Sequence, residues 1–229
     1  MTGLHKLLED NCEIIKVSSY AVRPQPIFEN AVVNTSIFFF VKTNTKCKQI
    51  FSTKMYRKNK DFDIRKLVNN LEFVDVKTVK LRGRYPKIST PVEKNILRKL
   101  FGQKNRVADF LITDGFPIYY RTTGGRYFKV ITPYSTGSTK EKPVFINKTH
   151  QNFLGAVLSS NLYFWFYQIY SNNLDLKSYE LESFPLPDFN SIKPKTIIDI
   201  ENSYNQYLED IEKNAFMLGT TIPREEYVL

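Results

Sequence analysis

A nearly unbroken run of β-branched and aromatic residues, from Val32 to Lys42, is the feature that most constrains the fold of this chain. Such residues favour strands, and a run without regular polar alternation is typical of a strand whose two faces are both covered. The segments 13–20 and 49–56 are strand candidates on either side of this run. We therefore predict a small N-terminal α/β piece whose sheet is covered on both sides.

Helical spacing and capping signals predict several helices. Thr90 followed by Pro91 is a helix start, and Gly102 is a stop. The aromatic segment 161–167 has rings on all sides, which favours a helix buried between layers over a stacking platform. A last helix rich in acids is expected to pack against the protein rather than against a polyanion. The predicted helices span residues 3–11, 63–70, 91–101, 152–170 and 196–217.

Three short strand candidates, 108–113, 116–121 and 126–132, are separated by the turn signals Asp114-Gly115 and Gly124-Gly125. Strands joined in this way predict a β-meander. Together with the helices, they make the expected fold class α+β. We expect three parts: an α/β piece over 1–75, a mixed domain with the meander and the buried helices over 76–190, and a helical tail over 191–229.

Basic residues are concentrated in the first two thirds of the chain. Residues 1–150 hold 28 Lys and Arg against 12 Asp and Glu, whereas residues 151–229 hold 5 against 11. Between residues 42 and 148, 25 basic residues interleave with aromatic and turn residues and face only 8 acids. This enrichment favours a surface that binds a nucleic acid, and a merely solvated basic face is the alternative.

Several other classes of protein are not indicated. Two cysteines and two histidines form neither a disulfide framework nor a zinc-ligand set. The polar N-terminus is no secretory signal, and the most apolar stretch, 154–170, is too short and too polar to cross a bilayer. We therefore expect a cytoplasmic protein without a membrane partner. No glycine-rich cofactor loop, phosphate loop or nucleophile elbow occurs, so no catalytic residue and no metal ligand is predicted.

Two groups of residues resemble a known family. The segment 23–31, Arg-Pro-Gln-Pro-Ile-Phe-Glu-Asn-Ala, followed by 34–40, Asn-Thr-Ser-Ile-Phe-Phe-Phe, resembles the closing strands of the catalytic domain in adenine-specific, gamma-class DNA methyltransferases. These include the type IIG restriction–modification enzymes. Segments 118–121 with 124–129, and 154–166 with 183–187, resemble their target-recognition region. The resemblance covers roughly residues 1–215, and it implies that 1–75 ends a methyltransferase domain and 76–190 recognises duplex DNA.

In that family, a phenylalanine just before the late strand stacks on the adenine that is flipped out of the duplex. Phe28 matches it by position, because a short loop separates it from the strand that begins near Val33. Flipping is needed because the target amine is out of reach inside the base stack. From the residues alone, Phe28 would be a core side chain; the resemblance makes it the candidate for flipped-base stacking.

The chain also departs from the family. The catalytic tetrapeptide, Asp or Asn followed by Pro-Pro and an aromatic, has no counterpart, since Pro-Pro occurs nowhere. The glycine-rich loop for S-adenosylmethionine and the acid that holds its ribose are also missing. We therefore expect a gene fragment or separate subunit that binds no cofactor and transfers no methyl group alone. Its expected partners are double-stranded DNA and the missing catalytic half, which would bring S-adenosylmethionine.

The expected DNA-binding residues are chosen by charge and turn context rather than by the family match. Arginines are expected to read base edges, and lysines to hold phosphates. Two alternatives stay open: a complete enzyme of another kind, and a basic protein-interaction or RNA-binding module without a role in methylation. The residues are Arg82, Arg84, Arg121 and Arg126 as readers, with Lys80, Lys87 and Lys129 as phosphate contacts.

Overall fold

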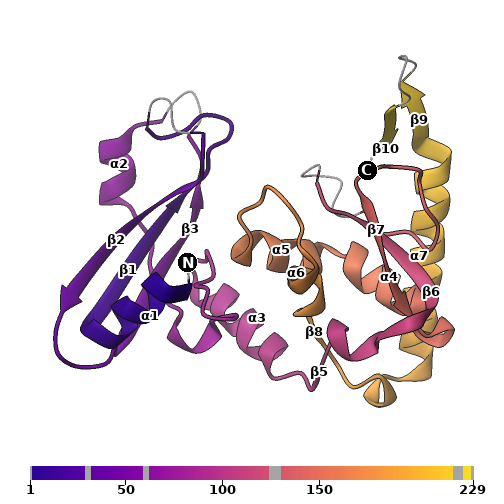
Figure 1. The fold of residues 1–229 in the computed structure, drawn as a ribbon, viewed down its shortest axis with the longest axis horizontal. Helices are drawn as coiled ribbons and strands as arrows, with labels where there is room; N and C mark the ends of the chain where they lie inside the picture. Colours follow the sequence, from indigo (N-terminus) through magenta and orange to yellow (C-terminus); the bar gives the residue numbers. More distant parts are fainter. Residues whose placement is uncertain (1, 29–31, 59–61, 124–129, 219–223, 228–229) are drawn as a thin grey trace. The chain divides into compact units, whose positions relative to one another are not determined.

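The computed structural model describes the backbone of residues 2–28, 32–58, 62–123, 130–218 and 224–227 (Figure 1). The chain divides into two compact units, which are described one at a time. The N-terminal unit comprises residues 1–102 and 168–172, and the C-terminal unit comprises residues 103–167 and 173–229. The fold class is α+β, as predicted, with small mixed sheets. The three-part division at residues 75 and 190 stays a prediction.

The N-terminal unit is built on one four-stranded sheet with the order β2-β1-β3-β4. Strand β1 runs antiparallel to β2 and parallel to β3, and β3 runs antiparallel to β4. The buried side chains of Ile15, Ile50 and Leu97 belong to its core. Its elements are α1 (Thr2–Asn11), β1 (Cys12–Tyr20), β2 (Thr35–Lys42), β3 (Gln49–Tyr56), α2 (Ile64–Asn69), β4 (Val74–Asp75), η1 (Lys77–Val79) and α3 (Pro91–Phe101).

The helices of this unit confirm the capping arguments made from the sequence. The Thr90 side chain accepts a hydrogen bond from the Glu93 backbone N–H, while the Glu93 carboxylate accepts one from the Thr90 N–H. This reciprocal capping box starts α3 at Pro91, and Gly102 follows its last residue. Asp63 similarly caps α2 by accepting from the backbone N–H groups of Arg65 and Lys66.

The position of β2 corrects one prediction. The apolar run does form a strand, but β2 lies at the edge of the sheet, and its second half, Phe39–Lys42, is exposed. The predicted burial on both faces is therefore wrong for the described residues. An apolar pattern shows that both faces of a strand could be buried. Burial also requires other elements of the fold to cover those faces, and the pattern does not show whether they do.

The C-terminal unit combines a two-stranded ribbon, β6 paired with β7, with a set of helices. Helix α5 spans both units, since its last residues, 168–170, belong to the N-terminal unit. The elements are β5 (Asn105–Arg106), η2 (Val107–Phe110), β6 (Leu111–Arg121), β7 (Glu141–Ile146), η4 (Lys148–His150), α4 (Gln151–Ser159), α5 (Asn161–Tyr170), α6 (Ser178–Glu182), β8 (Pro185–Leu186), η5 (Phe189–Ser191), α7 (Pro194–Asn214), β9 (Ala215–Leu218) and β10 (Arg224–Tyr227).

The predicted β-meander is corrected to a ribbon with a bulge. Asp114-Gly115 does not form a turn, because β6 continues through it and the pairing with β7 shifts between Leu111 and Phe116. A Cβ on Gly115 would lie 2.5 Å from the Ile146 carbonyl oxygen, so glycine here permits a close strand approach. The predicted strand 126–132 lies mostly outside the described residues; Thr132 at its end exchanges backbone hydrogen bonds with Tyr119.

The predicted helix 152–170 is two helices, because Ser160 is extended and ends α4. The Ser160 hydroxyl donates to the Val157 carbonyl and accepts from the Tyr163 N–H, so one serine serves the end of α4 and the start of α5. The aromatic segment lies in α5, where Tyr163, Phe166 and Tyr167 are buried. The expected role of this segment as core is confirmed.

The predicted acidic helix corresponds to α7, which packs against α4 through Gly155 and the buried Tyr204. A Cβ on Gly155 would lie well inside van der Waals distance of the Tyr204 ring. The Tyr204 hydroxyl also donates to the Ile131 carbonyl at 2.7 Å, which fixes the ring. Glycine at position 155 is therefore required by the close approach of the two helices.

We expect Gly155→Ala to destabilise the C-terminal unit by about 1–3 kcal/mol, the usual cost of overpacking. Trp165 is the only tryptophan and lies in this unit, so its fluorescence during urea unfolding measures the effect. In combination with Tyr204→Leu, which shortens the clashing side chain, the Gly155→Ala penalty should shrink. Strictly additive free energies in this double-mutant cycle would contradict the proposed contact.

Candidate nucleic-acid interface

The loop after β1 is held against the end of β3. The Ala21 N–H donates to the Tyr56 carbonyl at 2.8 Å, and the Arg57 guanidinium donates to the Arg23 carbonyl at 3.2 Å. Gln25 and Lys58 form a further antiparallel bridge. Because β1 and β3 are parallel and pair up to Tyr20 and Tyr56, the residues that follow each strand come together at one end of the sheet.

A second anchor holds the other end of this loop. The Asn34 side-chain oxygen accepts from the Val22 N–H at 2.7 Å, and its amide nitrogen donates to the Asn172 carbonyl at 2.5 Å. All three residues belong to the N-terminal unit. One asparagine thus ties the start of the loop to the residues just before β2, and the intervening segment, which carries Phe28, is closed at both ends.

Phe28 lies on this loop with 52% of its surface exposed. It follows Gln25 by three residues, so it lies within about 11 Å of the Gln25–Lys58 bridge. The interpretation from the residues alone, that Phe28 is a core side chain, is therefore wrong. An exposed phenylalanine ring on an anchored loop has a free face on which a planar group can stack.

Basic side chains lie beside this loop. Arg23 and Arg57 are exposed, Lys58 is half-buried, and the Arg57–Arg23 and Lys58–Gln25 contacts join them. We call Arg23, Phe28, Arg57 and Lys58 the Phe28 surface. A loop with an exposed ring and three basic residues on or against it offers both phosphate attraction and a stacking face, the combination found where proteins bind unpaired bases.

Sequence reasoning missed the three cations of this surface. Arg57 and Lys58 lie within the basic section 42–148, but no site was predicted there, because Arg23 and Arg57 are 34 positions apart. The signal that would have joined them is the parallel pairing of β1 with β3, which brings both strand ends to the same edge. The order of two strands along a sequence does not show whether they are neighbours.

The predicted phosphate contact Lys80 has an intramolecular partner. Its ammonium group lies 2.5 Å from one Glu9 carboxylate oxygen, and the Tyr85 hydroxyl donates to the other oxygen at 2.9 Å. Burial and the Glu9 carboxylate raise the pKa of Tyr85 far above its ordinary value. His5 stacks on the Tyr85 ring, with 4.3 Å between centroids. Lys80 therefore helps to attach α1 to the 80–85 segment.

Arg84 and Lys87 contact the end of helix α5. The Arg84 guanidinium donates to the Tyr170 carbonyl at 3.4 Å, and the Lys87 ammonium donates to the Ser171 carbonyl at 2.5 Å. Cations at a helix C-terminus satisfy its last carbonyls and complement its dipole. The structure thus gives both residues a role in holding α5, and their contacts with DNA stay predictions.

The other predicted DNA-binding residues are placed as follows. Arg82 is exposed at the tip of a tight turn, with φ 48° in the left-handed region, next to Gly83. Arg121 is half-buried at the end of β6 in the C-terminal unit. Arg126 and Lys129 lie outside the described residues. Of these four, Arg82 is the one whose described position leaves it accessible to a large ligand.

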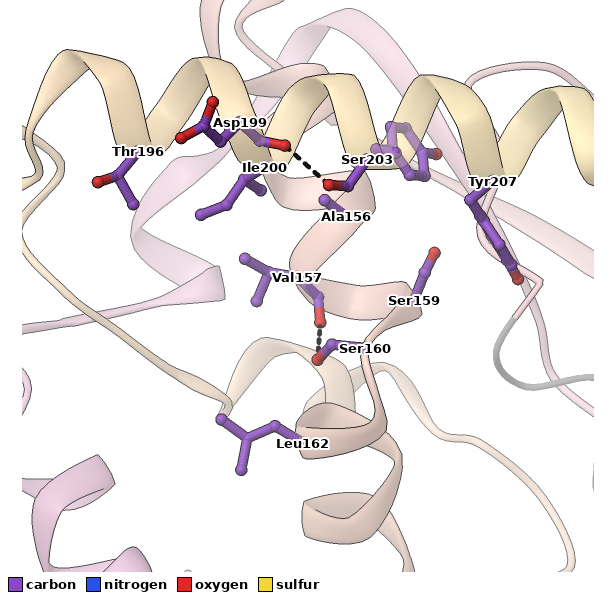
Figure 2. Close-up of a pocket in the computed structure, with 11 residues that line it drawn as sticks. Ala156, Val157, Ser159, Ser160, Leu162, Thr196, Asp199, Ile200, Ser203 and Tyr207 are labelled. Carbon is purple, nitrogen blue, oxygen red and sulfur yellow. Dashed lines mark hydrogen bonds between the residues drawn. The ribbon is translucent and has the colours of Figure 1, made fainter.

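The C-terminal unit contains an apolar groove of about 560 Å³ between α4, the start of α5 and α7 (Figure 2). Its polar groups are partly satisfied by their own helices: Ser203 donates to the Asp199 carbonyl and Ser160 to the Val157 carbonyl. The lining includes one carboxylate, Asp199, and neither a basic residue nor glycine. This groove does not fit S-adenosylmethionine, whose binding in the family needs a glycine-rich loop, nor does it fit a phosphate.

Among the described residues, no group of three or more His, Cys, Asp or Glu side chains is arranged to hold a metal ion. None of the described helices combines the length and apolar character needed to span a bilayer.

Comparisons of the chain with protein-family models, curated proteins and solved structures found no match.

Proposed function

We propose that this chain binds duplex DNA and that Phe28 stacks on an adenine rotated out of the helix. In this proposal the chain is the recognition part of an adenine-N6 DNA methyltransferase of a restriction–modification system. The polypeptide that carries the catalytic tetrapeptide and binds S-adenosylmethionine is a separate part. The chain itself positions the DNA and the base, and it transfers no methyl group alone.

The observation that carries the proposal is the exposed Phe28 ring on an anchored loop that also contains Arg23 and is held against Arg57 and Lys58. With 52% of its surface exposed, the Phe28 ring has a face that a planar base can contact. A base that leaves the stack loses its neighbours, and an aromatic face replaces part of that interaction. The cations attract the phosphates on either side of the same nucleotide. The net charge of the whole chain, +10, also favours binding to a polyanion.

The experiment uses a duplex with one 2-aminopurine opposite an abasic site, so that the probe base is already unpaired. We expect the chain to quench the fluorescence of this base, because stacking on an aromatic ring does so. Phe28→Ala should abolish the quenching and weaken binding about 5- to 150-fold, from the roughly 1–3 kcal/mol that one base–aromatic stack contributes. Phe28→Trp should retain the quenching.

Val33→Ala is the matched control, since Val33 is an apolar residue on the same loop, next to the Asn34 anchor, and is 60% exposed. It should bind and quench as the unaltered chain does. Equal quenching by Phe28→Ala would refute the stacking role. Equal affinity of the chain for duplex DNA, RNA and an acidic peptide would favour the protein-interaction or RNA-binding alternative over DNA recognition.

A further inference from the structure

The apolar groove of the C-terminal unit is separate from the Phe28 surface and has no part in the function proposed above. Its walls are α4, the start of α5 and α7 (Figure 2). Val157 and Ile200 face the groove from α4 and α7, and Leu162, with 43% of its surface exposed, lies at the α5 end. Covering apolar walls of this kind removes apolar surface from water, which favours a ligand with an apolar body.

The size of the groove suits a small molecule. Its volume of about 560 Å³ lies within the roughly 300–1,000 Å³ of small-molecule sites. Eleven residues line it, whereas a stable protein–protein interface uses roughly 20–30 residues on each side. The groove therefore accommodates a small ligand and offers too little surface for a protein partner.

Two polar groups one turn apart on the α7 rim are hydrogen-bond acceptors. Asp199 is exposed, and its carboxylate forms no ion pair with another described residue. The Ser203 hydroxyl donates its proton to the Asp199 carbonyl at 2.8 Å, so it has lone pairs and no donor left for a ligand. An ionised carboxylate likewise only accepts. The ligand group that meets this rim is therefore a donor, as an ammonium or a guanidinium is.

Charge at the groove favours a cation. Helices α4, α5 and α7 together hold five acids and two bases. Asp199 is the one charged residue of the lining. A cleft lined by charge of one sign attracts ligands of the opposite sign. The electrostatic field and the hydrogen-bonding groups thus select the same kind of head group.

We propose that this groove binds a small amphipathic amine, in which an apolar body ends in one ammonium or guanidinium group. The body lies against Val157 and Ile200, and the charged end meets the Asp199 carboxylate. This site is distinct from the Phe28 surface, and the inference does not depend on the proposed function.

The test compares n-octylamine, which is protonated at neutral pH, with n-octanol and octanoate by isothermal titration calorimetry of the full chain. The three share one apolar body and differ in the head group. We expect octylamine to bind about 1.5- to 5-fold more tightly than octanol, as for an exposed ion pair, and octanoate to bind most weakly. Hexylamine should bind up to about 15-fold more weakly than octylamine, since each buried CH₂ contributes about 4-fold.

Variants locate the site. Asp199→Asn should make octylamine and octanol bind equally, whereas Asp210→Asn, at an exposed α7 acid outside the lining, should keep the preference. Ser203→Phe fills the groove and should weaken octylamine binding at least about 10-fold. Asn202→Phe, at the adjacent exposed position outside the lining, should leave it unchanged. Trp165 fluorescence during urea unfolding checks that each variant is folded.

Absence of octylamine binding, equal affinity for the three head groups, or unchanged affinity in Ser203→Phe would overturn the proposal. A dimer that Ser203→Phe dissociates would also overturn it, by making a second copy the occupant. So would a helical peptide of leucine and lysine that binds this groove at least about 100-fold more tightly than octylamine, by making a polypeptide the occupant. Ser203→Phe should retain duplex DNA binding, so that a failure here is distinct from a failure of the Phe28 surface.

Discussion

Replacing Arg23, Arg57 and Lys58 together by glutamine is expected to weaken duplex DNA binding by about 100-fold or more at low salt. Each cation that contacts a phosphate releases a counterion, and the slope of log K against log salt changes by about 0.9 per contact. For three contacts the slope should become shallower by roughly 2.7. Fluorescence anisotropy of a labelled duplex over a series of salt concentrations measures both quantities.

The control removes the same amount of charge elsewhere. Lys193, Lys195 and Lys213 are exposed lysines at the start and the last turn of α7, and their triple replacement by glutamine gives the same net charge. We expect this variant to keep most of the affinity and the salt slope. Arg57→Lys alone should keep the slope while loosening the loop, because lysine lacks the planar fork that reaches the Arg23 carbonyl. Equal losses in both triple variants would indicate binding by net charge alone.

Local signals in the sequence predicted the elements well, because their causes are local. Thr90 and Glu93 form the box that starts α3, and Asp63 caps α2 through the next turn. Each of these interactions involves residues at most three apart, so the sequence contains the whole cause. The β-branched run likewise formed a strand, since its conformational preference does not depend on the neighbouring strands.

Errors arose where a residue serves a contact that is distant in sequence. Gly115 was expected in a turn, yet it is needed because the Ile146 carbonyl approaches it closely across the ribbon. Ser160 was expected inside a helix, yet its hydroxyl ends one helix and starts the next. In both cases the same residue type suits two local structures, and the tertiary context selects one of them.

The candidate site shows the same limit. Phe28 was found through family resemblance, while its charged neighbours were not, because their proximity depends on the pairing of β1 with β3. Conversely, Lys80, Arg84 and Lys87 were selected for their charge, and the structure shows them bound to a carboxylate or to helix carbonyls. Charge along a sequence identifies cations, but it does not show which of them already have a partner within the fold.

Raising the pH above about 10, the ordinary pKa of tyrosine, is expected to unfold the chain over a narrow range. Burial raises the pKa of seven tyrosines. For Tyr134, burial and then the hydrogen bond with Glu212 raise the pKa to about 12. For Tyr207, burial outweighs the hydrogen bond with Ser159, which lowers the pKa, and the pKa is again about 12. In the folded chain these hydroxyls keep their protons, whereas in the unfolded chain they lose them above pH 10. Their contribution to stability is therefore complete below pH 10 and is lost as the pH rises toward the folded values. The seven are Tyr85, Tyr120, Tyr134, Tyr163, Tyr170, Tyr204 and Tyr207.

Each such tyrosine lowers the free energy of unfolding by up to about 1.4 kcal/mol for every pH unit above 10, less where the side chain is partly exposed. The combined loss from several tyrosines exceeds the roughly 5–15 kcal/mol by which domains are stable. The circular dichroism signal should therefore fall, and the phenolate absorbance should rise, in one step. Tyr170→Phe provides the internal check. It removes the 2.5 Å hydrogen bond to the Val79 carbonyl, which lowers stability near neutral pH, but it also removes one titrating group. Its stability should therefore decline less steeply with pH than that of the unaltered chain, and parallel curves for the two proteins would show that Tyr170 does not contribute to alkaline unfolding.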